Sequence, residues 1–397
     1  MGKDFGQNNE KAIDLDGLSI ILDKTEQYMQ NSGYRGYDPY DGLESPIFNL
    51  PILRSAKIPR WGFQQVLKRI PFQIRPLFGI PKGYNPVTLA LAIQGFVSRD
   101  QANKKGPHSR KTEVERLVTE LERLQSPGFS GVCWGYDFDW EARYAAIPAW
   151  HPTVVVTGFV TNALFQAWKY YGLESAKDLC LAAVPFVVKD LNRTVDGDTF
   201  CWSYSPTDTQ IVLNATMKGS RLLAQAVHMG ADASCLEDAA ASIRYVVNRQ
   251  AENGSWPYSI GDTRSWADHF HTCYNLDCID EYQTLTGDHS FEESMEKGLD
   301  YYCSNFFTES GIPKYYDKET YPIDATCCGQ SLLTLIRFGK YDQAQKTQLW
   351  IQENMVIANG SFKYQIHRQF ENRLPYMRWS TGWLFAGLAS LESALIK

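Results

Sequence analysis

The sequence predicts an all-α protein, a toroid of six helical hairpins in the (α/α)6 arrangement. Three observations support this fold class: a helical segment recurs along the chain, a glycine follows most of its copies, and an aromatic-x-tyrosine pair precedes most of them. A regular repeat with two helices per unit is typical of stacked or closed arrays of helical hairpins.

The recurring segment has five clear copies. Their starts are 58, 57, 54 and 55 residues apart, at Thr157, Ala215, Thr272, Thr326 and Thr381. A sixth, weaker copy lies around Thr88. Glycine just past a helix is the usual left-handed cap, and it follows four copies, at Gly172, Gly230, Gly287 and Gly339. Each copy is therefore predicted to form one helix of about four turns.

Helices of a second kind are predicted between these copies. They carry charge on one face, which indicates an outer ring, and the predicted ranges are Cys235–Gln250, Phe291–Phe307 and Tyr341–Met355. The copies themselves are apolar nearly all round, which indicates burial in an inner ring. Two further helices are expected at Leu15–Met29 and Thr112–Gln125, whereas residues 31–86, rich in proline, are expected to be mostly loops.

The repeat also bears on domain organisation. No hairpin can bury its apolar face without its neighbours, so the chain is expected to fold as one domain. Residues 1–86 are predicted to be a lead-in with a loop-rich basic segment, packed on a helical-hairpin toroid formed by residues 87–397.

Composition narrows the class of protein. The chain has 397 residues, of which 44% are hydrophobic and 21% charged, as in a soluble globular protein. It contains no run of 18 apolar residues, its first residues are polar, and its nine cysteines are scattered without a Cys-x-x-Cys pair. A reduced, cytoplasmic protein is therefore expected. A P-loop, a glycine-rich dinucleotide motif and a Gly-x-Ser-x-Gly elbow are all absent, which disfavours nucleotide binding and serine hydrolysis. No cofactor is predicted.

Charge is unevenly distributed. Between Ser45 and Arg99 there is no acidic residue, but there are eight basic ones, namely Arg54, Lys57, Arg60, Lys68, Arg69, Arg75, Lys82 and Arg99. Residues 54–82 could contact an anionic membrane surface, form the rim of a cavity that receives an anionic substrate, or be an ordinary solvated face. Nucleic acid is not an expected partner, because no binding motif accompanies the basic stretch and the rest of the chain is acidic.

The loops before the inner helices are expected to meet at one mouth of the ring. They include residues 136–156, 258–270 and 364–379, and they carry the aromatic pairs Trp134/Tyr136, Trp202/Tyr204, Trp256/Tyr258 and Phe362/Tyr364, with Tyr315 in a degraded copy. Helix N-termini present free N–H groups and a positive dipole end, which favour anionic ligands. The repeated tyrosines would then face one cavity, although repeated Trp and Tyr can also brace loops.

Local motifs add a resemblance to a known superfamily. The sequences Gly-Ser-Trp-Pro-Tyr (254–258) and Trp-Ala-Asp-His-Phe-His-Thr (266–272) look like the loop and inner-helix start of carbohydrate-acting α/α toroids. That superfamily includes six-hairpin glycosidases, polysaccharide lyases, the helical domain of glucuronyl C5-epimerases and terpene cyclases. Residues 32–46 resemble the opening of an uncharacterised family of bacterial surface-polysaccharide biosynthesis proteins. Gln250, Gly254 and Trp256 fit one repeat of terpene cyclases, but the acidic Asp-x-Asp-Asp cluster of many such enzymes is absent.

The densest group of reactive residues lies just before one inner helix. It comprises Asp262, Arg264, Trp266, Asp268, His269 and His271. Histidine is the natural acid or base near neutral pH, and a carboxylate can orient it. The predicted catalytic residues are His271, Tyr258, His269, Asp268 and Arg378. The predicted substrate-binding residues are Trp134, Tyr136, Asp139, Arg143, Trp202, Tyr204, Asn214, Trp256, Arg264, Trp266, Tyr315, Tyr364 and Arg368.

These residue types favour proton abstraction beside a uronate carboxyl group, ending in C5-epimerisation or β-elimination on an anionic polysaccharide or lipid-linked glycan. In that reaction Arg378, Arg143, Arg368 or Asn214 would neutralise the carboxylate. An inverting hydrolase is the first alternative, with its two carboxylates drawn from Asp139, Glu141, Asp268 and Asp324. An isoprenoid cyclase and a non-catalytic glycan-binding ring are further alternatives.

Two groups of residues contain side chains that can bind a metal ion. The first is His269-x-His271-x-Cys273 and the second is the pair Cys327-Cys328. Alternate residues of a helix point apart, so the first group cannot bring its ligands together once the helix has begun. No metal site is therefore predicted.

Overall fold

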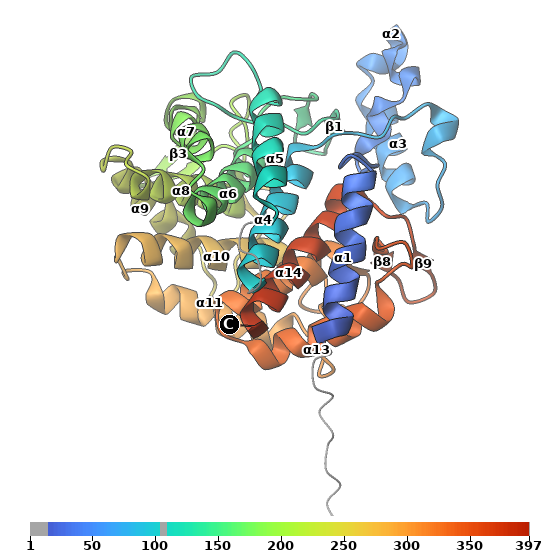
Figure 1. Ribbon diagram of the computed structural model, residues 1–397. Helices are drawn as coiled ribbons and strands as arrows, with labels where there is room; N and C mark the ends of the chain where they lie inside the picture. Colours follow the sequence, from blue (N-terminus) through green and yellow to red (C-terminus); the bar gives the residue numbers. More distant parts are fainter. Residues whose placement is uncertain (1–14, 104–108, 397) are drawn as a thin grey trace, which may run out of the picture.

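The computed structural model describes residues 15–103 and 109–396 and confirms the predicted fold class. Six helices form the inner ring: α4 (Pro86–Ala102), α6 (Val154–Tyr171), α8 (Leu213–His228), α10 (His269–Thr286), α12 (Ala325–Arg337) and α14 (Trp383–Ile396). Each packs against the next, and α14 packs against α4. The ring is therefore closed (Figure 1).

The outer ring consists of α5 (Lys111–Arg123), α7 (Glu174–Ala182), α9 (Cys235–Val247), α11 (Glu292–Asn305), α13 (Tyr341–Asn354) and α1 (Leu15–Asn31). Helix α1 packs against α14, so the first described helix covers the last one (Figure 1). Part of the predicted lead-in thus supplies the sixth outer helix. Among the described residues, no helix is both long and apolar enough to cross a membrane.

The expectation that residues 31–86 are mostly loops was wrong for one stretch. The segment contains the helix α3 (Lys57–Arg69), the short helix α2 (Pro51–Arg54) and three 3-10 turns at Asp41–Glu44, Pro46–Asn49 and Arg75–Phe78. Pro59 lies in the first turn of α3, where the N–H that proline lacks would have no partner within the helix. The prolines therefore mark helix starts here as well as loops.

The recurring tyrosines are held over the inner helices by one repeated backbone hydrogen bond. The carbonyl of Tyr204 accepts from the N–H of Val154, the first residue of α6, at 3.0 Å. Tyr258, Tyr315 and Tyr364 do the same for the first residues of α8, α10 and α12, at 3.2, 3.0 and 3.0 Å. Each loop thus satisfies a free N–H at the start of the preceding inner helix. This bond explains why the tyrosines recur with the helices and why they gather at one mouth.

The aromatic residue ahead of each tyrosine has a structural role. Trp134, Trp202 and Trp256 are 0–2% exposed, and their loops pack against the inner helices. The backbone N–H of Trp134 donates to the hydroxyl of Thr157 at 3.1 Å, and that of Trp202 donates to Thr216 at 3.1 Å. The threonines of the repeat therefore anchor the loops.

Short strands connect the loops around the mouth. Strand β5 (Ile211–Val212) pairs with β6 (Ser259–Ile260), and β7 (Ile323–Asp324) pairs with β8 (Gln365–Ile366), which joins neighbouring loops. The other pairs lie within single loops: β1 (Trp140–Glu141) with β2 (Ala146–Ile147), β3 (Arg193–Asp196) with β4 (Thr199–Trp202), and β8 with β9 (Glu371–Asn372).

A chain of polar side chains crosses the ring below the mouth. Asn162 of α6 donates to Gln94 of α4 at 3.2 Å, and Gln225 of α8 donates to Asn162 at 3.0 Å and to Glu281 of α10 at 3.2 Å. Glu281 also pairs with Arg337 of α12 at 2.9 Å. The prediction that the inner helices are apolar nearly all round was therefore wrong where these side chains lie: Gln94, Asn162 and Gln225 are buried, Glu281 is partly buried, and Arg337 is exposed at the end of the chain of bonds.

Two inner helices cross through a pair of glycines. A Cβ added to Gly387 of α14 would overlap the carbonyl of Gly329 on α12, and a Cβ at Gly329 would overlap the carbonyl of Trp383. We expect Gly387→Ala to lower the free energy of unfolding by about 1–3 kcal/mol, because backbone rather than a flexible side chain must move. Chemical denaturation followed by circular dichroism measures this effect.

Gly62 provides the matched control. It lies within α3, and a Cβ there would meet no heavy atom within 4 Å. We expect Gly62→Ala to leave stability unchanged or to raise it by up to about 1 kcal/mol, because alanine favours the helix over glycine. If Gly387→Ala were as well tolerated as Gly62→Ala, the close crossing of α12 and α14 would be contradicted.

Candidate active site

A cavity of about 490 Å³ opens at the mouth of the ring. Its deeper walls come from the first turns of the inner helices, and its upper walls come from the tyrosine loops and α3. More than half of the residues that line it are aromatic. Four of the tyrosines expected to face one cavity line it: Tyr136, Tyr204, Tyr258 and Tyr315. Such a surface suits the flat faces of a sugar ring.

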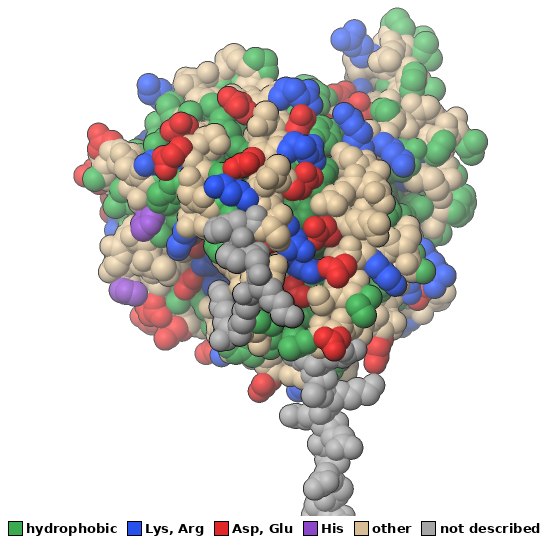
Figure 2. All heavy atoms as spheres, in the orientation of Figure 1, with side chains coloured by type: hydrophobic (Ala, Val, Ile, Leu, Met, Phe, Trp, Pro, Cys, Tyr) green, Lys and Arg blue, Asp and Glu red, His purple; other side chains and the backbone are tan. Residues whose placement is uncertain are grey.

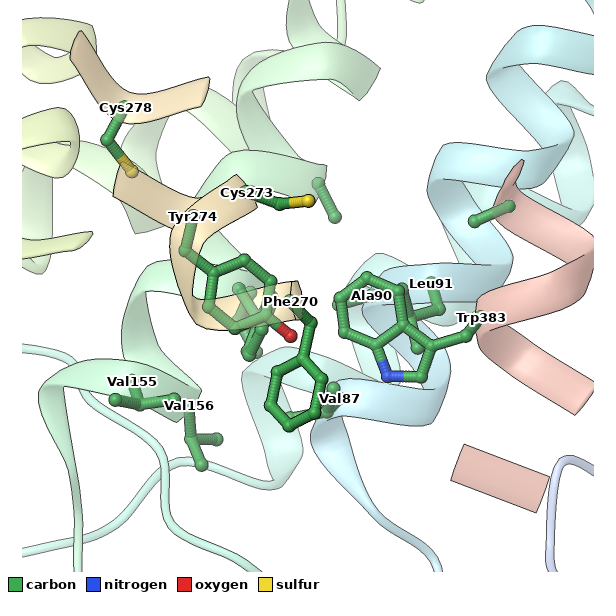
Figure 3. Packing of buried hydrophobic residues seen from close by; sticks show 14 of the residues in the cluster. Val87, Ala90, Leu91, Val155, Val156, Phe270, Cys273, Tyr274, Cys278 and Trp383 are labelled. Carbon is green, nitrogen blue, oxygen red and sulfur yellow. The ribbon is translucent and has the colours of Figure 1, made fainter. Parts of the chain in front are cut away.

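The floor of the cavity is a cluster of rings from different inner helices. Figure 3 shows Phe270 and Tyr274 of α10 near Trp383 of α14, with Val87 of α4 and Val155 of α6 around them. The rings of Tyr274 and Trp383 are stacked with centroids 6.0 Å apart, and all five side chains line the cavity. The floor is therefore apolar and held from several sides.

His271 and Asp268 form a dyad at the start of α10. Asp268 caps this helix by accepting from the N–H of His271 at 3.1 Å, and its second oxygen lies 2.6 Å from Nδ1 of the same histidine. Asp268 is 2% exposed, whereas the His271 side chain is 23% exposed and lines the cavity. With Nδ1 held by the carboxylate, Nε2 is the nitrogen available to a ligand. Two of the predicted catalytic residues are thus in contact.

Tyr258 lies beside this dyad. Its ring centroid is 4.6 Å from that of His271, and it stacks on Trp266 at 5.8 Å. Desolvation in the cavity raises the pKa of Tyr258 above its usual value of 10, and the nearby Arg264 only partly opposes this shift. Tyr258 is therefore protonated at neutral pH and can donate a proton or a hydrogen bond.

The structure places His269, the other predicted catalytic histidine, away from the cavity. It is 0% exposed, with Nδ1 2.8 Å from the carbonyl of Lys314 and Nε2 2.9 Å from the hydroxyl of Tyr302. Burial lowers the pKa of His269 to about 4. Both ring nitrogens therefore have hydrogen-bond partners within the protein. Residues two positions apart at the start of α10 point in different directions, so His269 points away from the cavity that His271 lines. His269 is a structural residue, and it does not join His271 in a metal site.

Five basic residues line the cavity, against two acidic ones, Glu141 and Asp268. Two of the predicted basic residues are already paired: Arg378 with Asp38 at 2.6 and 2.9 Å, and Arg264 with Asp262 at 2.6 Å. The other three are Arg143, Lys68 and Arg69, near the rim. Of the basic segment 54–82, Lys68 and Arg69 therefore line the cavity.

Asn214 is a predicted ligand that the structure places at the cavity wall. It lies in the first turn of α8 and is 2% exposed. Its Nδ2 has no hydrogen-bond partner among the described residues. A buried amide donor without a partner lowers stability, and a substrate oxygen that accepted its hydrogen bond would remove this penalty.

Six predicted substrate-binding residues do not line the cavity: Trp134, Trp202, Trp256, Tyr364, Asp139 and Arg368. The three tryptophans brace loops, as described above. Tyr364 is 1% exposed and packs on Tyr376 in a separate cluster. Asp139 pairs with Arg60 at 2.9 Å, and Arg368 is exposed.

The carboxylates proposed for hydrolysis are mostly committed to other roles. Glu141 accepts from Arg60 at 3.2 Å, and Asp268 holds His271. Asp324 caps α12 and accepts from Gln365 at 2.7 Å. Of the four candidates, only Glu141 and Asp268 line the cavity.

Several cavity residues were not predicted. Tyr40 and Trp61 come from the segment before α4, and Trp379 comes from a π-helical turn at Met377–Gly382 that precedes α14. Lys218 of α8 lies beneath the floor, with Nζ 3.7 Å from the ring centroids of both Phe159 and Tyr274. Desolvation lowers the pKa of this lysine well below its usual value. In the sequence, the one sign of this residue was a lysine within a helix that was predicted to be buried.

Comparisons with known proteins agree with this architecture. A cellobiose 2-epimerase from Bacillus thermoamylovorans has a TM-score of 0.61 over 79% of this chain and 88% of its own, at 10% identity. A possible member of the GH105 family from Salmonella enterica has a TM-score of 0.64 over 97% of this chain and 96% of its own, at 9% identity. The chain has the α/α-toroid fold.

A third similar structure is the family 76 glycoside hydrolase Bt3792, a mannosidase from Bacteroides thetaiotaomicron, with a TM-score of 0.58 over 95% of this chain and 98% of its own, at 9% identity. No protein-family profile and no curated protein sequence matches the chain. At identities near 10% these similarities establish the fold of the toroid and leave its chemistry to the site.

Proposed function

We propose that this toroid is a carbohydrate-modifying enzyme that removes a proton beside the carboxylate of a uronate sugar. The observation that carries the proposal is the His271–Asp268 dyad, because it places one oriented imidazole in an aromatic cavity whose charged lining residues are mainly basic. Structures with this fold include proteins described as an epimerase and as glycoside hydrolases, which supports carbohydrate as the substrate class.

The residues suggest a division of roles. Nε2 of His271 takes the C5 proton, while Asp268 stabilises the imidazolium that forms. The electron pair moves into the uronate carboxylate, which Asn214 and the rim cations stabilise. The intermediate then takes a proton from water on the opposite face, giving the C5 epimer, or expels the oxygen at C4, which takes a proton from Tyr258 and leaves an unsaturated sugar.

This reaction fits the site better than hydrolysis does. Inverting hydrolysis needs a protonated acid and a free carboxylate base on opposite sides of the bond. Here both lining carboxylates are held by cationic or imidazole partners, whereas the imidazole of His271 has a free nitrogen. A glycoside hydrolase therefore remains the second candidate.

One assay separates these outcomes. The protein is incubated in deuterium oxide with oligosaccharides that contain uronate, and with a neutral oligosaccharide as the control. An epimerase incorporates deuterium at C5, a lyase produces ultraviolet absorbance, and a hydrolase releases reducing ends without either signal. Reducing ends alone, or equal turnover of the neutral substrate, would refute uronate proton abstraction.

The rim cations make a separate prediction. We expect Arg143→Gln and Arg69→Gln each to raise KM for a uronate oligosaccharide about fivefold, as loss of an exposed ion pair implies. The methyl ester of the same substrate lacks the negative charge and serves as the control, with KM expected to be insensitive to both changes. An equal effect on ester and acid would show that these arginines do not bind the carboxylate.

A further inference from the structure

A projecting segment of the chain exposes apolar side chains beside basic ones. It runs from Pro46 to Lys82, includes α2 and α3, and stands away from the ring in Figure 1. We call it the basic lobe. Its apolar side chains are unusually exposed, with 85% for Ile52, 81% for Ile58 and 83% for Leu77.

This exposure is concentrated rather than scattered. The described residues include 18 large apolar side chains that are exposed, and nine of them lie in the basic lobe, which spans 37 of the 397 residues. Single exposed apolar residues are ordinary on a protein surface, but a group of this kind indicates an interaction surface. Figure 2 shows apolar and basic side chains together on this projection.

The charge of the lobe has one sign. It contains no aspartate or glutamate, and its exposed basic residues are Arg54, Lys57, Arg69 and Lys82. Two other arginines are used internally: Arg60 pairs with Asp139, and Arg75, which is 0% exposed, pairs with Asp41 at 2.6 Å. The exposed cations therefore remain available to an anionic partner.

The positive charge of the basic lobe favours one kind of binding partner over another. A second copy of the chain would bring two basic lobes together in a symmetric interface, where like charges repel. Apolar tips flanked by lysine and arginine, without acidic residues, fit the interfacial layer of an anionic bilayer. We propose that the basic lobe docks the protein on an anionic lipid membrane, with Ile52, Ile58 and Leu77 inserted among the headgroups.

Docking would bring the cavity close to the bilayer. Helix α3 belongs to the lobe and also contributes Trp61, Lys68 and Arg69 to the cavity wall. A glycan carried on a lipid would then be presented at the mouth of the ring. This consequence rests on the proposed function, whereas docking itself does not depend on any reaction.

Vesicle sedimentation of the full chain tests the proposal. We expect binding to vesicles of phosphatidylcholine and phosphatidylglycerol in equal parts, weakened by salt, and little binding to phosphatidylcholine alone. Joint replacement of Ile52, Ile58 and Leu77 by serine should weaken binding about a hundredfold. Arg54→Gln with Lys82→Gln should weaken it about tenfold or more.

Matched variants elsewhere on the surface complete the test. Ile20→Ser with Val195→Ser removes apolar side chains that are 55% and 68% exposed, and Lys189→Gln with Lys297→Gln removes the same charge. Both should bind like the unaltered protein. Equal binding to neutral and anionic vesicles, no binding, or unchanged binding of the lobe variants would overturn the proposal. So would sedimentation velocity showing a dimer that the serine variant dissociates. The assay contains no carbohydrate, so its failure leaves the proposed reaction untouched.

Discussion

Replacement of His271 with alanine is expected to lower kcat/KM for proton abstraction by about 10²–10⁴-fold, the usual contribution of a general base. The side chain lines the cavity, and among the described residues the hydrogen-bond partner of its ring is Asp268, on Nδ1, which leaves Nε2 to act. The measurement is deuterium incorporation at C5 of a uronate oligosaccharide. Added imidazole should restore part of the lost rate by occupying the vacated space.

Controls distinguish this chemical role from a structural one. Asp268→Asn keeps a good helix cap, because asparagine caps as well as aspartate, but removes the charge that stabilises the imidazolium. It should therefore lower kcat while leaving the thermal transition nearly unchanged. Tyr258→Phe should affect the lyase product more than deuterium exchange, because Tyr258 is assigned to the leaving oxygen. Activity of His271→Ala within tenfold of the unaltered protein would rule out His271 as the base.

The second large effect concerns stability in acid and arises from His269. Burial lowers its pKa from 6.5 to about 4, so the unfolded chain binds a proton more tightly than the folded one. The contribution of neutral His269 to the free energy of unfolding is fully present above pH 6.5 and is lost as the pH falls toward 4. The expected loss is about 3 kcal/mol over that window.

Comparison with His269→Gln isolates this contribution. The variant loses hydrogen bonds to Lys314 and Tyr302 and should be less stable near pH 8, by about 1–2 kcal/mol. The difference should shrink and then reverse as the pH approaches 4, because only the natural protein must keep a neutral histidine. Denaturation at several pH values measures this difference. His289→Gln, at a side chain that is 68% exposed, is the control and should leave the pH dependence unchanged. A constant difference across the range would contradict the buried neutral state of His269.

The repeated helices were predictable because their signals are local. The copy around Thr157 became α6, which ends before Gly172 with φ of 67°, and the copy at Thr272 became α10, which ends before Gly287 with φ of 73°. The last copy is less regular, since a π-helical turn at Met377–Gly382 precedes α14. That turn depends on packing around the mouth, which the periodicity of the chain does not encode.

In the candidate site, too, some contacts follow from the local sequence and others depend on distant segments. The contact between Asp268 and His271 was predictable, because a helix cap and a residue three positions later are always neighbours. The pairing of Arg378 with Asp38 joins residues 340 positions apart, and it changes Arg378 from a free cation into a neutralised one. His269 and His271 were indistinguishable by type, and only their directions at the start of α10 separate a buried structural residue from a cavity residue.

Spacing along the chain was sufficient to predict the repeated hairpins and the loop that carries the dyad, because helices, caps and neighbouring side chains obey short-range rules. Contacts between distant segments close the ring through α14 and α4, and they set which tyrosines line the cavity, which cations remain free and how far the basic lobe projects. Those properties depend on burial and on pairing across the ring, and both arise only when all six hairpins have packed together.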